Sequence, residues 1–202
     1  MSYAVDPHAD EARALEAARQ GDVAAFNQLV LRYQTVAYNV ALRTLGNPEE
    51  AADATQETFI SAFRALDDFR GGSFKAWLLR ITVNACYDIL RRRQRRPASS
   101  LDELTEQGDE SFGATDTGQG PEGAALNAET ARAIQAALLT LPADQRTLVL
   151  LCDVQGLSYE EAAEATQVAL GTVKSRLSRA RARLRDHLRE RGELPVDSGR
   201  HT

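Results

Sequence analysis

The sequence predicts an all-α protein of two small helical domains joined by a flexible acidic linker, with a helix-turn-helix in the second domain. Apolar residues recur at spacings of three and four on both sides of the linker, and no strand-like alternation persists. The segment from Pro97 to Asn127 is rich in Gly, Ser, Thr and acidic residues and has no Lys or Arg. The predicted divisions are an N-terminal extension (1–21), a first domain (22–97), the linker (98–127), a second domain (128–191) and a tail (192–202).

The first domain is expected to be a bundle of about four helices. An amphipathic stripe runs from Phe26 to Val40, and Gly46-Asn47-Pro48 predicts the end of that helix. Gly71-Gly72-Ser73 predicts a short loop before a further helix begins at Phe74. Arg70 to Arg93 interleaves aromatic, cationic and polar residues, as single-stranded nucleic-acid binders do, although Phe74, Trp77 and Tyr87 also suit a core, which we favour for Trp77.

Charge is distributed unevenly along the chain. It has 24 Lys and Arg against 29 Asp and Glu, a net charge of -5, yet cations gather in LRRRQRRP and in GTVKSRLSRARARLRDHLRERG. Local charge therefore indicates nucleic-acid binding where net charge does not. Cys86 and Cys152 lie far apart in apolar contexts and are expected to be reduced core thiols. With no signal peptide or apolar run long enough to span a bilayer, we expect a cytoplasmic protein without membrane insertion.

A helix-turn-helix is predicted near the C-terminus. Ser158 and Glu161 fit a capping box that starts a short helix to about Thr166, and a tight turn leads into the basic helix. The buried face of the basic helix is expected to hold Val173, Leu177, Ala180, Leu184 and Leu188. The opposite face carries residue types that bind base edges and phosphates, whereas Arg181, Arg183, Arg185, Arg189 and Arg191 suit phosphate or solvent. The alternative is a solvated basic surface.

An acidic cluster, Glu49, Glu50, Asp53 and Glu57, begins the helix after Pro48. Such residues stabilise a helix N-terminus through its dipole. They could instead hold Mg²⁺, as in all-helical nucleotide pyrophosphohydrolases, but a second acidic helix is then needed and none is evident from Phe26 to Leu45.

Three stretches occur in order: EEAADATQETFISAFRALDDFRG, SFKAWLLRITVNACYDILRRRQRR and, after the linker, LPADQRTLVLLCDVQGLSYEEAAEATQVALGTVKSRLSRARARLR. Together they closely resemble a bacterial RNA polymerase sigma factor of the extracytoplasmic-function (ECF) group, from about Asp22 to Leu188. The resemblance implies that residues 22–97 are sigma region 2 and residues 128–191 are sigma region 4. It implies a factor, not an enzyme, that binds core RNA polymerase, directs it to promoters and assists melting, without a cofactor or metal.

The resemblance also implies roles for individual residues. The polymerase-binding surface would be formed by Asp53, Gln56, Glu57 and Phe59. The melted non-template strand of the minus-ten element would be bound by Phe69, Arg70, Ser73, Phe74, Arg80, Asn84, Arg91 and Arg92, with Arg93, Arg95 and Arg96 in the same basic run. Duplex DNA of the minus-thirty-five element would be bound by Thr172, Lys174, Ser175, Arg176, Ser178 and Arg179. The acidic linker would run toward the polymerase active centre.

The sequence departs from the family in the turn of the helix-turn-helix, where Gln167 stands in place of the usual Gly and a mild backbone strain is expected. An anti-sigma factor is a candidate partner, because family members are often held inactive by one. Two other functions stay open at this point: a stand-alone DNA-binding regulator that uses only the helix-turn-helix, and the Mg²⁺-dependent nucleotide hydrolase.

Overall fold

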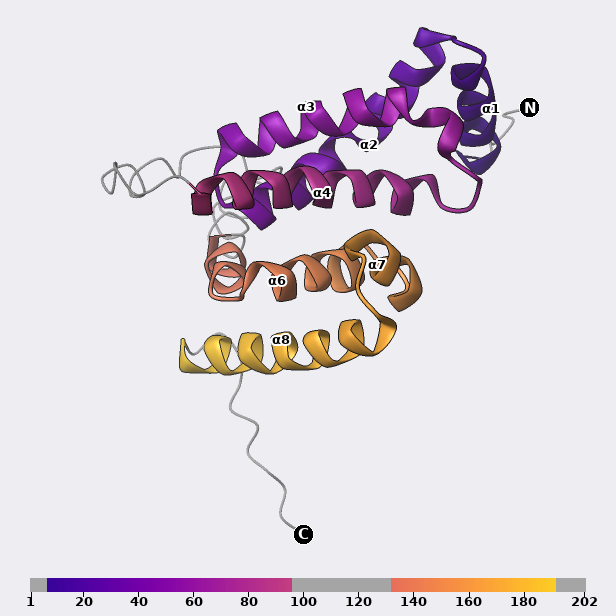
Figure 1. Cartoon of the computed structure of the whole chain (residues 1–202). Helices are drawn as coiled ribbons and strands as arrows, with labels where there is room; N and C mark the ends of the chain where they lie inside the picture. The colour runs from indigo at the N-terminus through magenta and orange to yellow at the C-terminus, as the bar shows by residue number, and fades with distance from the viewer. Residues whose placement is uncertain (1–6, 96–131, 192–202) are drawn as a thin grey trace, which may run out of the picture.

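The computed structural model describes residues 7–95 and 132–191, and in these ranges the chain is helical with no strand (Figure 1). The predicted all-α fold is confirmed. The first range contains α1 (Pro7–Arg19), α2 (Val23–Leu45), α3 (Pro48–Arg64), the 3-10 turn η1 (Leu66–Asp68) and α4 (Phe74–Arg95). The second contains a helix over 132–139, α6 (Ala143–Val149), the π-helical turn η2 (Leu150–Val154), α7 (Tyr159–Thr166) and α8 (Leu170–Glu190). None of these helices is long and apolar enough to cross a membrane.

Local capping residues set the helix boundaries. Asp22 accepts hydrogen bonds from the backbone amides of Ala24 and Ala25, and Asn47 accepts one from the amide of Glu50. Gly46 ends α2 in the left-handed conformation, with φ of 72°. This position favours glycine because of its left-handed backbone angle; a Cβ atom there would lie 3.0 Å from Cδ2 of Leu139, an exposed side-chain end that would have to shift slightly.

Helix α1 belongs to the first packed unit. Its Ala14 and Ala18 are buried in one cluster with Phe26, Leu66 and Phe69. Glu11 accepts a hydrogen bond from the hydroxyl of Tyr33 on α2. The division placed at residue 22 therefore falls inside a packed unit, which extends from Pro7 to Arg95; we call it the first unit.

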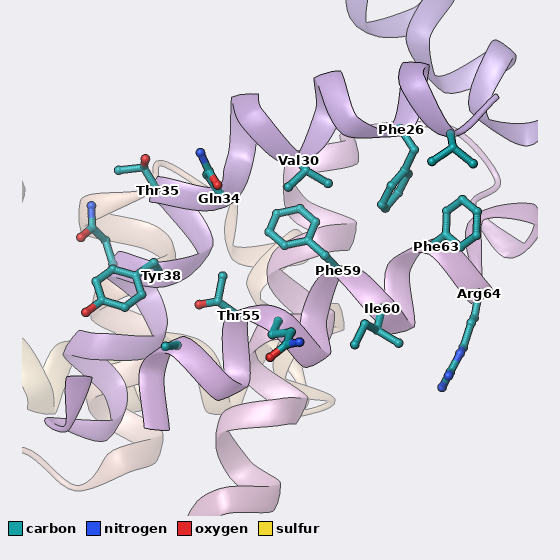
Figure 2. Close-up of a pocket in the computed structure, with 14 residues that line it drawn as sticks. Phe26, Val30, Gln34, Thr35, Tyr38, Thr55, Phe59, Ile60, Phe63 and Arg64 are labelled. Atoms are coloured by element: carbon teal, nitrogen blue, oxygen red, sulfur yellow. The ribbon is translucent and has the colours of Figure 1, made fainter. Parts of the chain in front are cut away.

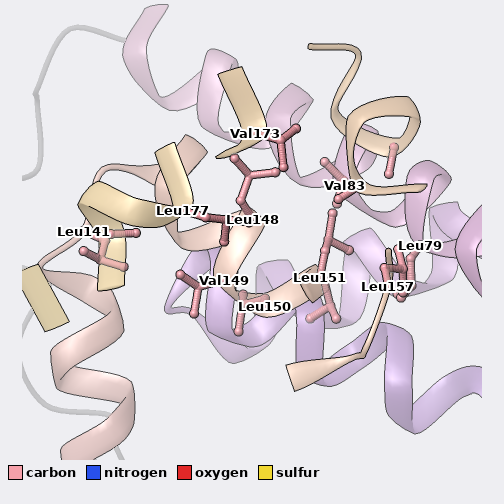
Figure 3. Close-up of a cluster of buried hydrophobic side chains, with 14 of the residues drawn as sticks. Leu79, Val83, Leu141, Leu148, Val149, Leu150, Leu151, Leu157, Val173 and Leu177 are labelled. Carbon is pink, nitrogen blue, oxygen red and sulfur yellow. The ribbon is translucent and has the colours of Figure 1, made fainter. Parts of the chain in front are cut away.

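The second unit, residues 132–191, packs directly on the first. Figure 1 shows α4 between the α2 and α3 layer and the helices α6 and α7, with α8 on the far side. Leu79 and Val83 of α4 are fully buried in the same cluster as Leu148 and Leu151 of the second unit (Figure 3). The sequence predicted two domains on a tether and did not predict this contact. The linker and the tail lie outside the described residues.

Arg146 of α6 joins the two units through a buried guanidinium. Its Nη1 donates to the carbonyl oxygen of Thr44 on α2 at 2.5 Å. Its other nitrogens donate to the carbonyl oxygens of Leu138 (2.9 Å), Leu139 (3.3 Å) and Leu141 (3.0 Å), at the end of the preceding helix. Burial is the main cause that lowers the pKa of Arg146, and the positive charge of Arg93 lowers it further. The carbonyl oxygens stabilise the buried charge of Arg146. The bond to Thr44 holds the start of the second unit against α2.

Replacing Arg146 with alanine should lower the free energy of unfolding by about 3 kcal/mol, because three buried carbonyl groups and one partly buried one lose their donor. Chemical denaturation followed by circular dichroism measures the change. The matched control is Arg132→Ala, an exposed arginine near the start of the same unit, which should cost no more than about 0.5 kcal/mol. Equal denaturation midpoints for the Arg146→Ala and Arg132→Ala variants would contradict the structural role of Arg146.

Candidate nucleic-acid and protein-binding surfaces

The helix-turn-helix consists of α7, a turn and α8. Ser158 caps α7 by accepting from the amide of Glu161 (3.1 Å), whose carboxylate accepts from the amide of Ser158 (2.8 Å), so the predicted capping box is confirmed. Gln167 ends α7 in the left-handed region, with φ of 56° and ψ of 38°, and is the one non-glycine residue with positive φ in the part of the chain that the structure describes. Helix α8 begins three residues later, at Leu170.

Helix α8 has one buried and one open face. Val173, Leu177 and Ala180 are buried, which fixes the rotation of the helix on α6 and α7. The open face carries the exposed side chains of Lys174, Ser175, Ser178 and Arg179, with Thr172 partly buried beside them. Arg179 donates to the carbonyl oxygen of Ser175 (3.2 Å) and to its hydroxyl (3.3 Å). Exposed hydroxyl and guanidinium groups on one helix face can bind both base edges and phosphates.

Arg181 is exposed, and its guanidinium also makes hydrogen bonds within the second unit. Its guanidinium donates to both carboxylate oxygens of Asp153 (3.0 and 2.5 Å) and to the hydroxyl of Tyr159 (3.2 Å). The hydrogen bonds to Asp153 and then to Tyr159 raise the pKa of Arg181. Arg181 is therefore exposed, as expected, but it is also paired with Asp153. Helix periodicity could not reveal it, because Asp153 is distant in sequence.

Arg176 is also engaged within the second unit. Its Nε lies 3.1 Å from Oδ2 of Asp144 on α6, and its side chain is about one-third exposed. The predicted DNA contacts of α8 therefore divide into an exposed set and one arginine that is already paired. Arg176 is available to DNA only if it leaves Asp144.

The loop before α4 is supported by aromatic side chains. Phe69 and Phe74 are buried, and their rings lie 5.7 Å apart and 5.4 and 5.5 Å from the ring of Trp77. Arg19 of α1 lies over the Phe69 ring at 5.7 Å. Phe69 and Phe74 are thus buried in the core, whereas the resemblance implied that both bind the minus-ten element. The core interpretation of Trp77 is confirmed.

Between these two phenylalanines, Arg70 and Ser73 are exposed at the loop tip. The hydroxyl of Ser73 accepts from the amide of Ala76 (3.1 Å), so Ser73 also caps α4. The structure therefore places a short polar loop over a cluster of packed aromatic side chains.

Helix α4 continues the polar surface beyond the loop. Asn84, Arg91 and Arg92 are exposed and Arg80 is partly buried. Arg93 differs from its neighbours, because its Nε donates to Glu50 of α3 at 2.9 Å and its Nη1 to the carbonyl oxygen of Leu45 at 3.2 Å. Arg91 and Arg92 are engaged only within α4, by the carboxylate and the carbonyl oxygen of Asp88, so Arg93 is the arginine here that contacts another helix. Arg96 lies outside the described residues.

Helix α3 presents an acidic stripe beside an apolar groove. Asp53, Gln56 and Glu57 are exposed on one face of the helix and Phe59 is partly buried. The groove between α2 and α3 has a volume of about 1020 Å³, and Figure 2 shows Val30, Phe59, Ile60 and Phe63 along it. Ile60 and Phe63 are 38% and 43% exposed and line this groove together, and a contiguous exposed apolar patch is typical of a protein-binding site. The spacing of Ile60 and Phe63 is the signal that sequence reasoning missed.

The acidic cluster does not form a metal site. Glu50 is paired with Arg93, and arginines 92, 93 and 95 line the same hollow as Asp53 and Glu57. No three His, Cys, Asp or Glu side chains come together as metal ligands within residues 7–95 or 132–191. These observations give the Mg²⁺-dependent hydrolase no support.

Gln167→Gly should stabilise the protein by about 0.5–1 kcal/mol, because a left-handed residue with a Cβ costs roughly 1–2 kcal/mol and the entropy of glycine offsets only part of that. The measurement is again the free energy of unfolding. Gln155→Gly is the matched control, since Gln155 has φ of -93° and gains no relief from glycine, so that variant should lose stability. A loss in both variants would contradict the strain at Gln167.

Comparisons with known proteins bear on both units. The family model described as Sigma-70 region 2 matches residues 29–96, and the model described as Sigma-70, region 4 matches residues 131–184. The chain is 42% identical over 171 residues to the ECF RNA polymerase sigma factor SigE of Mycolicibacterium smegmatis, which covers 83% of this chain and 64% of that protein. It is 40% identical over 169 residues to the ECF RNA polymerase sigma-E factor of Escherichia coli, which covers 83% and 88% of the two chains.

Two solved structures are also similar. One is CnrH in complex with the cytosolic domain of CnrY, with a TM-score of 0.62, 28% identity, and coverage of 90% of this chain and 98% of that one. The other is the sigma factor RpoE in complex with the anti-sigma factor NepR from Bartonella quintana, with a TM-score of 0.65, 31% identity, and coverage of 83% and 98%. With matches to both regions, and with relatives of this identity along most of its length, the chain belongs to the ECF group of RNA polymerase sigma factors.

Proposed function

We propose that this chain binds core RNA polymerase through α3 and the adjoining groove, contacts the minus-ten element with the first unit and recognises the minus-thirty-five element with α8. As a sigma factor it is a transcription initiation factor and not an enzyme, and the polymerase performs the chemistry. The open face of α8, set opposite a fully buried one, is the observation that carries the proposal. The protein acts in the cytoplasm, where the polymerase and its template are.

The polymerase-binding surface combines charge with apolar contact. Asp53, Gln56 and Glu57 supply exposed polar groups, and Phe59 with the groove supplies apolar area. A surface of this kind suits a protein partner, because aromatic residues at the centre of an interface provide most of the binding energy and charges at the rim favour the correct partner. The solved RpoE relative is bound to an anti-sigma factor, so an anti-sigma factor is a candidate second partner here.

Minus-ten recognition is proposed for the loop tip and the exposed side of α4. Arg70 and Ser73 would contact a nucleobase extruded from the DNA over the aromatic side chains that support the loop. Asn84 would contact the edge of a nucleobase. Arg80, Arg91 and Arg92 would bind phosphates by charge. Phe69 and Phe74 would act by holding the loop, since both are buried.

Minus-thirty-five recognition is proposed for the exposed residues of α8, which would enter the major groove as the second helix of the motif. The contacting residues would be Thr172, Lys174, Ser175, Ser178 and Arg179, joined by Arg176 if it leaves Asp144. A stand-alone regulator would use only this helix and would leave the surfaces of α3 and α4 without a role.

The polymerase surface is tested with the triple variant Asp53→Ala, Gln56→Ala, Glu57→Ala. Wild-type protein should co-purify with core RNA polymerase at moderate salt, and the triple variant should lose most of this binding because the rim charges are removed. The matched control is Asp10→Ala and Glu16→Ala on α1 with Gln20→Ala in the turn that follows it, which removes the same side-chain types elsewhere. Equal losses in the two triple variants, or duplex DNA binding by a wild type that never binds polymerase, would contradict the proposal.

The α8 surface is tested by sequencing the DNA that holoenzyme selects from a random duplex pool. Arg179→Ala should relax the preference at one or two positions of the upstream motif, a loss of about 1–3 kcal/mol in discrimination. The downstream motif should keep its sequence. Arg13→Ala, which removes an exposed arginine from α1, is the control and should select the wild-type motifs. An unchanged upstream motif in Arg179→Ala would rule out base contact by this residue.

A further inference from the structure

Helix α1 packs next to the minus-ten loop, by which we mean residues 70–73. The helix lies outside residues 29–96, the part of the chain that matches Sigma-70 region 2. Its two buried alanines belong to one cluster with Phe69 and Phe74, the residues on either side of the loop. Figure 1 shows α1 at the end of the first unit where the chain turns from η1 into α4. The helix is therefore placed where it can influence the loop.

Arg19, the last residue of α1, contacts the chain just before the loop. Its guanidinium carbon lies over the ring of Phe69, 5.7 Å from the ring centre. Its Nε atom also donates to the carbonyl oxygen of Leu66 in η1, at 3.5 Å. A cation over the face of an aromatic ring is attracted by the negative charge of that face. Arg19 therefore restrains Phe69, the residue after which the loop begins.

Glu11, about two turns earlier in α1, restrains the chain just after the loop through Tyr33. Its carboxylate accepts a hydrogen bond from the hydroxyl of Tyr33 on α2. Burial is the main cause that raises the pKa of Tyr33, and the bond to Glu11 raises it further, so the phenol keeps the proton that it donates. The ring of Tyr33 lies 5.5 Å from the ring of Phe74, the first residue of α4. Helix α1 thus acts on both ends of the loop.

The loop itself has little to hold its path. Gly71 and Gly72 have φ of 96° and 84°, a region that glycine adopts without strain. A Cβ atom at either glycine would have no atom within 4 Å, and Arg70 is exposed. Because glycine is the least restricted residue, the position of the loop depends on the residues that anchor its two ends.

We propose that α1 is a positioning element of the minus-ten site, and that Arg19 and Glu11 hold the loop in the geometry that selects one extruded nucleobase. Neither residue would touch DNA, since each acts through an aromatic ring beneath the loop. The inference rests on the proposed function. A site is selective when its contacting groups are held within about 0.5 Å of the productive geometry, so a displaced Phe69 should reduce selectivity.

The selectivity of the loop can be measured with holoenzyme made from this protein and core RNA polymerase of Escherichia coli. The probes are fluorescent single-stranded oligonucleotides that carry the downstream motif selected by wild type, with all four bases in turn at each position. Arg70→Ala identifies the position that the loop reads, because discrimination should fall there. The affinities of each holoenzyme for the four oligonucleotides then give the discrimination at that position.

Arg19→Ala should lower discrimination at the same position by about two- to fivefold, the equilibrium factor of an exposed cation–π contact. Arg19→Lys should recover at least half of that loss, because lysine keeps a cation over the Phe69 ring. The matched control is Arg13→Ala, which removes another exposed arginine of α1 and should behave as wild type. Arg19 is itself exposed, so its removal leaves no cavity, and circular dichroism should show unchanged helix content.

Tyr33→Phe tests the other end of the loop. It keeps the ring beside Phe74 and removes the hydroxyl that donates to Glu11, so discrimination should fall at the same position as in Arg19→Ala. Both variants should still bind core polymerase and select the wild-type upstream motif, because α3 and α8 are unchanged.

Unchanged discrimination in the folded Arg19→Ala and Tyr33→Phe variants would overturn the inference, as would an Arg19→Lys variant no better than Arg19→Ala. A uniform loss of affinity for all four bases, with a salt slope reduced by about one, would mean that Arg19 binds a phosphate directly, and would also overturn it. A wild-type holoenzyme that discriminates at no position of a downstream element would instead overturn the proposed function, and the inference with it.

Discussion

The packing of α4 on two apolar faces is the constraint on which the rest of the structure depends. One face closes the bundle with α2 and α3, and the other, through Leu79 and Val83, receives the second unit. With both faces covered, only the remaining side of α4 is left for Asn84, Arg91 and Arg92. The helix that would contact melted DNA is therefore also the helix that joins the two units.

The arginines fall into two groups that composition does not distinguish. Arg93, Arg146 and Arg181 are used by the fold, because their guanidinium groups donate to a carboxylate or to carbonyl oxygens from distant parts of the chain. Arg70 and Arg179 are exposed beside a loop and on a helix face. A cation already surrounded by acceptors gains little from a phosphate, whereas an exposed one loses only water. The exposed group is thus the better guide to the nucleic-acid surfaces.

Features set by neighbours in sequence were predictable, and features set by distant contacts were not. The capping box of α7 and the strained Gln167 were expected because each depends on a few adjacent residues. The pairing of Arg181 with Asp153 was not, because it depends on how η2 and α8 pack. Phe69 and Phe74 were expected to contact DNA, and their burial follows from the aromatic cluster under the loop. The contact between units has one sequence signal, the second apolar stripe of α4, which is ambiguous without its partner.

The central claim is that one chain supplies two promoter-binding surfaces, one on each unit. Sequencing of the 5′ ends of RNA made by core polymerase and this protein from a random promoter library tests it most directly. The account predicts start sites preceded by two motifs at a nearly constant spacing. Transcripts no more abundant than with core polymerase alone, or start sites sharing a single motif, would contradict it.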